Sequence, residues 1–283
     1  MKPPPFTYHR PETRDEVDAL LSTYGPDAKI LAGGQSLVPI LNMRLASPAH
    51  IIDINHLQGE PDEPGDDGDA VIFGPLVRQE TVERSALVSD KVPLLAETIE
   101  YVAHAAIRNR GTVVGSVAHA DPAAELPAVL AALGGTVKAR NSSGRREILA
   151  SEFFSGPLEN AMGDDEWAEG VRWPAREAGE GFAFTEFARR AGDYAICGVA
   201  AVVRGSPRTL TLAYLGMGDV PVALNAPLES DMEVEDAVAE LADSLDAAGD
   251  IHATPRYRSW LARKLGVRVA RAAAAGAGDG DAR

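Results

Sequence analysis

The sequence predicts an α+β fold with more than one lobe, and three observations support this class. A helical pattern and two short strand patterns alternate near the N-terminus, within a unit of about sixty residues, the size at which a lone core is marginal. An acidic stretch rich in turn-forming residues separates this unit from a second set of strands and helices. After another polar stretch, three strand patterns follow one another and two helical patterns come last. Strands and helices grouped in this way are typical of α+β proteins.

Composition limits the classes of function. A chain of 283 residues can bury a full core. Its net charge of −15 argues against nucleic acid or an anionic membrane as a partner. The single cysteine, Cys197, allows neither a disulfide nor a cysteine-ligated iron–sulfur cluster within the chain, and its apolar neighbours predict burial. With neither a signal peptide nor an apolar run long enough to span a bilayer, we expect no membrane insertion and a cytoplasmic location.

The first unit has clear start and stop signals. Thr13 and Glu16 have the spacing of a capping box before a helical pattern, and Gly25 precedes a proline where that helix should end. We expect strands at Lys29–Leu31 and His50–Ile54.

The second unit begins after a loop predicted at Gly59–Asp69. This loop lacks the ordered ligands and closing glutamate of a calcium site. The following patterns predict a strand at Ala70–Val77, a helix at Pro93–Ile107, a helix at Leu126–Leu133, and a hairpin of Thr136–Arg140 with Arg146–Leu149. We place a domain boundary in the polar stretch Gly163–Gly181.

The C-terminal part should be a meander of strands closed by helices. The predicted strands are Phe182–Phe187, Ala195–Arg204 and Thr209–Leu215, and the predicted helices are Val234–Leu245 and Pro255–Ala275. Thr254 is expected to cap the last helix, because a proline occupies its first position. The tail from Gly276 should fray.

A strand ending in paired glycines is the most informative local feature. Glycine allows positive φ and leaves successive backbone N–H groups open to an anion, which is how a chain wraps a phosphate. Taken by itself, the pattern fits an ordinary strand-to-loop turn equally well. The candidate residues of this first turn are Leu31, Ala32, Gly33, Gly34, Gln35, Ser36 and Leu37.

A second glycine-bearing run follows the predicted helix 93–107. Two such turns can close around one diphosphate from opposite sides. The candidate residues of the second turn are Thr112, Val113, Val114, Gly115 and Ser116.

Three motifs in order carry a family resemblance: AGGQSLVP from Ala32, TVVGSVAHADPAAELPA from Thr112, and ARRAGDY from Ala188. Together they resemble the FAD-binding medium subunit of the molybdenum hydroxylases, the group that includes carbon monoxide dehydrogenase and xanthine dehydrogenase, over nearly the whole chain. The resemblance implies a two-lobed FAD-binding domain of the vanillyl-alcohol oxidase (PCMH) type, with lobes at residues 1–57 and 58–176. A smaller α+β domain at residues 177–283 would follow.

The resemblance also implies roles for single residues. The FAD diphosphate would lie between the two turns, and Glu125 would accept hydrogen bonds from ribityl or ribose hydroxyls. For Asp121, two roles fit equally well: the same contact with hydroxyls, or the N-cap of a helix that starts at Pro122. Asp193 and Tyr194 would belong to a loop that covers the isoalloxazine, with Tyr194 stacked on the ring. The alternative for this segment is a plain hairpin turn with a surface arginine pair.

Val114 departs from the family pattern, which has paired glycines here. A valine would be strained by about 1–3 kcal/mol if this position needs positive φ. If close approach is what matters, its side chain would press on the cofactor or a neighbouring strand. We therefore expect weaker FAD binding or a shifted diphosphate, which the variant Val114→Gly tests.

By resemblance, the chain is the electron-transfer subunit of an oxidoreductase. A molybdenum-cofactor large subunit would hydroxylate the substrate, and a small subunit with [2Fe-2S] clusters would pass electrons to FAD. No residue is assigned as a catalyst or a metal ligand. The alternatives are a stand-alone flavin oxidase or dehydrogenase and a scaffold subunit without flavin. Gln35 stands where carbon monoxide dehydrogenase has histidine, which favours hydroxylases of N-heterocycles and aromatic compounds.

Overall fold

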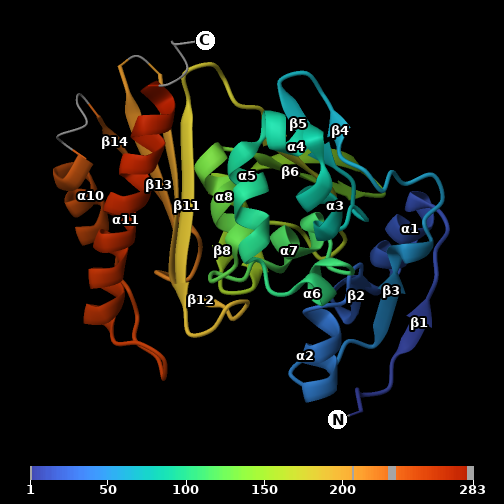
Figure 1. The fold of residues 1–283 in the computed structure, drawn as a ribbon. Helices are drawn as coiled ribbons and strands as arrows, with labels where there is room; N and C mark the ends of the chain where they lie inside the picture. Colours follow the sequence, from blue (N-terminus) through green and yellow to red (C-terminus); the bar gives the residue numbers. More distant parts are fainter. Residues whose placement is uncertain (1, 206, 229–233, 279–283) are drawn as a thin grey trace.

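The computed structural model describes residues 2–205, 207–228 and 234–278. Three sheets follow one another across the molecule, from the N-terminal lobe, through a helix-rich middle lobe, to a C-terminal domain with a long last helix (Figure 1). No helix in the described ranges combines the length and apolar character needed to cross a membrane. In the same ranges, no group of histidine, cysteine, aspartate or glutamate side chains could hold a metal ion.

The N-terminal lobe is a small parallel sheet in the order β1-β3-β2, with two helices. Its elements are β1 Thr7–His9, α1 Arg14–Tyr24, β2 Ala28–Leu31, α2 Leu37–Met43 and β3 His50–Asp53. The predicted capping is confirmed, because the Thr13 hydroxyl accepts a hydrogen bond from the Glu16 N–H at 3.3 Å. Gly25 ends α1 with a φ of 47°, which glycine adopts without strain.

The middle lobe is built on a five-stranded sheet in the order β4-β5-β10-β6-β7. Its strands are β4 Gly65–Asp66, β5 Ala70–Phe73, β6 Thr136–Asn141, β7 Gly144–Leu149 and β10 Trp167–Pro174, with a small pair β8 Phe154–Gly156 and β9 Glu159–Asn160 beside it. Its helices are α3 Gln79–Arg84, α4 Ala86–Lys91, α5 Pro93–Thr98, α6 Ala105–Arg108, α7 Val113–His119, α8 Glu125–Leu133 and α9 Ala150–Phe153.

Three sequence predictions for the middle lobe are wrong. The stretch Gly163–Gly181, expected to be a polar break, contains β10, the central strand of the sheet. Its apolar residues, among them Trp167 and Trp173, are buried. The helix expected at 93–107 is interrupted, since Ala103 adopts a φ of 45° and Arg108 holds the break by donating to the Val102 carbonyl at 2.8 Å. The predicted first strand stops at Phe73, and the preceding loop contributes the two-residue strand β4.

The first two lobes share contacts that fix their relative position. The Trp167 indole packs into the core of the N-terminal lobe and donates to Asp18 at 2.8 Å. Arg14 of α1 pairs with Glu169 of β10 at 2.5 Å. Glu169 is only 7% exposed, so this ion pair is less screened by solvent than a surface pair.

The C-terminal domain is an antiparallel meander covered by helices on one face. Its elements are β11 Gly181–Ala188, β12 Ala195–Arg204, β13 Thr209–Leu215, β14 Val222–Pro227, α10 Val234–Asp243 and α11 Pro255–Gly278. Sequence analysis missed β14. Helices α10 and α11 cover the outer face, while α5 and α8 of the middle lobe pack against the inner face (Figure 1).

Two further predictions concern this domain. Cys197 is fully buried within β12, as expected. The helix α11 starts at Pro255, with Thr254 accepting from the Tyr257 N–H at 3.3 Å, and continues to Gly278. The fraying predicted from Gly276 is therefore wrong up to Gly278, and residues 279–283 lie outside the described residues.

Candidate functional site

The two predicted turns lie against each other, although they come from different lobes. A Cβ atom built on Gly33 would stand 2.5 Å from the Arg110 carbonyl oxygen and 2.8 Å from the Gly111 Cα. A Cβ built on Gly115 would lie 3.9 Å from the Ala32 side chain. Glycine at position 33 therefore allows a close approach between backbones that any other residue would block.

The first turn presents backbone donors. Gly34 adopts a φ of 74°, and its carbonyl accepts from the Val38 N–H at 3.1 Å as α2 begins. Within the described chain, no acceptor takes the backbone N–H groups of Gln35, Ser36 and Leu37. The Gln35 amide folds back and donates to the Gly33 carbonyl at 3.1 Å. Three successive free N–H groups at the start of a helix are a suitable cradle for phosphate oxygens.

The second predicted turn is the N-terminus of α7. Thr112 is the N-cap, and its hydroxyl accepts from the Gly115 N–H at 3.1 Å. The N–H of Val113 donates to the Val77 carbonyl and that of Ser116 donates to Thr112, both at 3.1 Å. Most N–H groups of this segment are therefore used inside the protein. Its contribution to anion binding would come mainly from the positive end of the helix dipole.

Val114 lies in the first turn of α7 and is 3% exposed, with its side chain in the core of the middle lobe. It has no positive φ. The expectation of left-handed strain at this position is therefore wrong, because a helix accepts valine at little cost.

An asparagine and an arginine hold the two turns together. Asn55 donates to the Ala32 carbonyl at 2.8 Å. Arg78 donates to the Asn55 side-chain oxygen at 2.7 Å and to the Arg110 carbonyl at 2.5 Å. Sequence analysis missed both Asn55 and Arg78, because their partners are distant in the chain and no local pattern marks them.

The side chains of Arg78 and Arg110 bring positive charge to the place where the two turns meet. Burial lowers the pKa of Arg78 from its ordinary value, and the charge of Arg110 acts in the same direction, while the charge of Asp53 acts in the opposite one. Neither Arg78 nor Arg110 forms an ion pair within the residues that the structure describes. A partly buried cation with no carboxylate in direct contact favours an anion nearby.

The carboxylates that follow α7 have different surroundings. Asp121 accepts from the Ala123 N–H at 2.9 Å and thereby closes a turn, whereas the next helix, α8, starts only at Glu125. The alternative of Asp121 as a helix N-cap is therefore wrong. Glu125 is 6% exposed, and burial raises its pKa to about 7.

A second, half-buried carboxyl group lies near Glu125. Burial, together with the charge of Glu125, raises the pKa of Glu186 on β11 to about 8. One carboxylate oxygen of Glu186 is buried without a hydrogen-bond partner in the described chain. Sequence analysis missed Glu186, because an isolated glutamate in a strand pattern gives no sign of a distant carboxylate. Burial thus favours the protonated form of both carboxyl groups.

The predicted Asp193–Tyr194 segment reaches the same region. Burial of the Tyr194 hydroxyl, together with the charges of Asp121 and Glu125, raises its pKa to about 12. The residue as a whole remains 60% exposed, so its ring faces open space. Gly192 has a φ of 81°, and a Cβ there would stand 2.5 Å from the His104 ring. The loop is thus held against the segment between α5 and α6, with Asp193 exposed at its tip.

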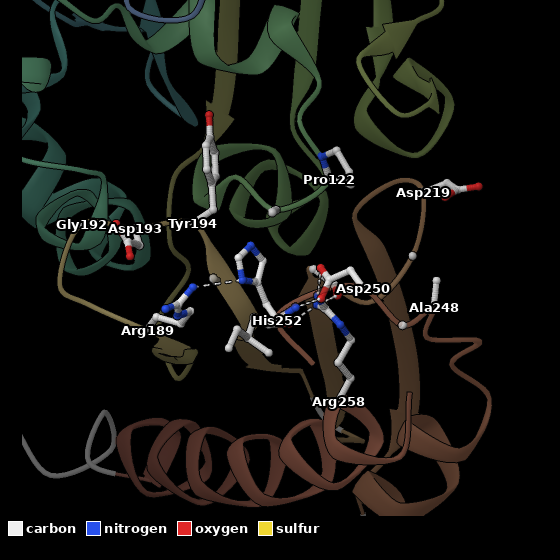
Figure 2. A pocket seen from close by; sticks show the side chains of 16 residues that line it. Pro122, Arg189, Gly192, Asp193, Tyr194, Asp219, Ala248, Asp250, His252 and Arg258 are labelled. Atoms are coloured by element: carbon white, nitrogen blue, oxygen red, sulfur yellow. Dashed lines mark hydrogen bonds and ion pairs between the residues drawn. The ribbon is translucent and has the colours of Figure 1, made fainter. Parts of the chain in front are cut away.

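A cavity of about 600 Å³ opens between this loop, the turn after α7 and the C-terminal domain. Figure 2 shows the side chains of Arg189, His252, Asp250 and Arg258 gathered on one side of it, while the Tyr194 ring points away from α11. Arg258 donates to Asp250 and to the Gly216 carbonyl, both at 2.6 Å. Such a volume is typical of sites for cofactors and other small molecules.

The candidate residues therefore form two groups. Residues of the two turns meet at Gly33, by the N-terminus of α7. Asp121, Glu125 and Tyr194 meet at the other end of α7, and this helix is about 10 Å long. The first group has free N–H donors and positive charge for a diphosphate. In the second, Tyr194 lines the cavity, and the carboxyl groups of Asp121 and Glu125 act on its hydroxyl. This arrangement fits an extended dinucleotide whose diphosphate and ring system occupy separate sites.

Comparison with known families agrees with this geometry. Residues 4–176 match the family described as the FAD binding domain in molybdopterin dehydrogenase. Residues 182–273 match the CO dehydrogenase flavoprotein C-terminal domain. The chain belongs to the FAD-binding medium subunits of the molybdenum hydroxylases: it is an oxidoreductase subunit, and its cofactor is FAD.

Several relatives match along almost their entire length. The chain is 38% identical to the nicotine 6-hydroxylase medium subunit of Paenarthrobacter nicotinovorans, over 94% of this chain and 96% of that protein. It is 36% identical to the caffeine dehydrogenase subunit beta of Pseudomonas sp. (strain CBB1), over 96% of both. A solved carbon monoxide dehydrogenase from Hydrogenophaga pseudoflava superposes with a TM-score of 0.90 at 32% identity, covering 97% of this chain and 99% of that one. The predicted fold class is confirmed, whereas the domain limits at residues 57 and 176 and the roles of single site residues stay predictions.

Proposed function

We propose that this chain carries electrons between an iron–sulfur subunit and an external acceptor within a molybdenum hydroxylase complex. A large subunit with the molybdenum cofactor would hydroxylate the substrate, and a small subunit with [2Fe-2S] clusters would deliver the electrons. The observation that carries the proposal is the contact of the two turns at Gly33, which would form a diphosphate cradle in a chain of this family. Relatives named as subunits of caffeine dehydrogenase and carbon monoxide dehydrogenase support it.

The chain's own share of the work is binding and orientation. The N–H groups of Gln35, Ser36 and Leu37 would hold the diphosphate, with the N-terminus of α7 opposite. Arg78 would keep the two sides at a fixed distance through its bonds to Asn55 and Arg110. When bound, FAD supplies the reversible exchange of electrons.

At the ring end, we assign three residues to control of the surroundings. Tyr194 would cover one face of the ring system and exclude water. The carboxyl groups of Glu125 and Glu186 would hold a proton beside it, because both have pKa values raised by burial. We assign no residue of this chain to chemistry on the hydroxylated substrate.

Anaerobic mixing of the FAD-loaded chain with the reduced iron–sulfur subunit tests this function. We expect the flavin absorption band to bleach while the cluster band recovers. Addition of a small organic substrate to the chain alone should leave the flavin oxidised. Flavin reduction by substrate without a partner would instead identify a stand-alone dehydrogenase, and a chain that refuses FAD even in the complex would identify a scaffold.

A further inference from the structure

The last helix has an unusual charge for this protein. Between Ile251 and Gly278 the chain has six basic residues and neither aspartate nor glutamate, although its net charge is −15. Three of the six form ion pairs with acids elsewhere in the C-terminal domain: Arg258 with Asp250, Arg263 with Asp243, and Arg271 with Glu235. The others, Arg256, Lys264 and Arg268, have no ion pair within the described ranges. The last helix thus carries three cations without an ion pair on a molecule that is acidic overall.

Exposed aromatic side chains lie on the same helix. Trp260 is 53% exposed, and its ring stacks on that of Tyr257 with centroids 5.8 Å apart. Phe187 of β11 meets Tyr257 edge to face at 6.2 Å and is 41% exposed. Nearby in sequence, Ile251 is 94% exposed. Large apolar side chains gathered in the open are uncommon on an isolated surface and are typical of protein interfaces.

This surface adjoins the mouth of the cavity. Phe187 comes two residues before Arg189, and Ile251 directly precedes His252. Arg189 and His252 line the cavity and lie 3.3 Å apart, within hydrogen-bond distance (Figure 2). A protein bound here would stand beside the entrance through which the ring system of the cofactor is reached.

We infer that Phe187, Ile251, Arg256, Tyr257, Trp260 and Lys264 form a docking surface for the iron–sulfur subunit, which would contact it through an acidic surface with an apolar centre. The inference rests on the proposed function and adds the place and chemistry of the contact. We call these six residues the aromatic–basic face.

Charge and spacing support this choice of occupant. Tyr257, Trp260 and Lys264 follow one another at helical spacings of three and four, so they share one face of α11. The basic residues complement an acidic partner and would speed its approach, whereas the aromatic residues at the centre would hold it. A second copy of this chain is a poorer occupant, because two like-charged basic faces would repel each other.

Binding of the purified iron–sulfur subunit to the FAD-loaded chain tests the inference. The variants are Trp260→Ala and Arg256→Glu, and Arg10→Glu is the matched control, because Arg10 is an exposed arginine of the N-terminal lobe. We expect each of the two variants to weaken the affinity at least tenfold. The Arg256→Glu variant should also show a smaller loss of affinity as salt is added. The control, the retained flavin and the melting temperature should stay unchanged.

The outcomes separate the inference from the proposed function. If the wild-type chain does not bind the iron–sulfur subunit at all, the proposed function fails. If it binds and both variants bind equally well, the aromatic–basic face is not the docking surface. Loss of binding only to the molybdenum subunit, or only of self-association, would also overturn the inference, because the face would then serve another partner.

Discussion

Replacing Gly33 with alanine should separate the two turns that we assign to the FAD diphosphate. Gly33 does not have a positive φ, so alanine suits the backbone and the effect is purely steric. The new Cβ would stand 2.5 Å from the Arg110 oxygen, 2.8 Å from the Gly111 Cα and 3.0 Å from the Thr112 nitrogen. All three are backbone atoms, which cannot rotate away as a flexible side chain can.

The size of the effect follows from these distances. Ordinary contacts need about 3.5 Å, so the segments must part by roughly 1 Å. Overpacking of this kind costs about 1–3 kcal/mol of stability. The same shift would pull the free N–H groups of the first turn away from the N-terminus of α7. We expect FAD affinity to fall by about 10- to 100-fold, which corresponds to roughly 1.4–2.7 kcal/mol.

Titration of the purified chain with FAD, followed by flavin fluorescence, measures this loss, and a thermal melt without FAD measures stability. Gly65→Ala is the matched control, since its new Cβ would have only the Ile72 oxygen within 4 Å, at 3.9 Å. The control should bind FAD as wild type does. Wild-type affinity in the Gly33→Ala variant would refute the assignment of this contact to the diphosphate site.

Three further predictions follow from the same site. In Arg78→Lys, the lysine lacks the forked guanidinium that donates to both Asn55 and the Arg110 carbonyl. FAD affinity should therefore fall several-fold in the same titration. An unchanged affinity would mean that FAD binding does not need these two hydrogen bonds. Val114→Gly removes a buried side chain from the first turn of α7. Denaturant unfolding should therefore show a free energy of unfolding lower by about 2–4 kcal/mol, without tighter FAD binding. A gain in FAD affinity would instead mean that this valine obstructs the cofactor. Burial raises the pKa of Glu125 to about 7. Between its unfolded pKa of about 4.5 and about 7, the folded chain therefore holds more protons than the unfolded chain, and stability should fall as the pH rises through this window. Glu125→Gln should flatten that fall in chemical denaturation curves, by on the order of 1–3 kcal/mol, and an unaltered pH profile would contradict the assigned burial.

Local signals predicted most of the elements. The Thr13 cap, the Gly25 stop and the paired glycines act within a few residues, so the sequence around them determines the structure. The expectation that Cys197 is buried also needed only its apolar neighbours. The strand β10 was not predicted because acidic residues flank it and suggested a solvated stretch, although its one glutamate, Glu169, is buried against Arg14 of another lobe.

The site was predictable in part for the same reason. The glycine turns and Tyr194 follow motifs that can be read along the chain. The bonds of Arg78 and the proximity of Glu186 to Glu125 join residues that only the tertiary fold brings together. The second turn shows a further limit, because its glycine and threonine suggested an open loop, whereas Thr112 caps a helix and uses the available N–H groups.

The most direct test of the account is the absorption spectrum of the purified chain after incubation with FAD and desalting. We predict a retained flavin band with about one FAD per chain, present in wild type and in Gly65→Ala and reduced in Gly33→Ala. A chain that stays colourless both alone and after assembly with the molybdenum and iron–sulfur subunits would contradict the assignment of the two turns to a flavin site.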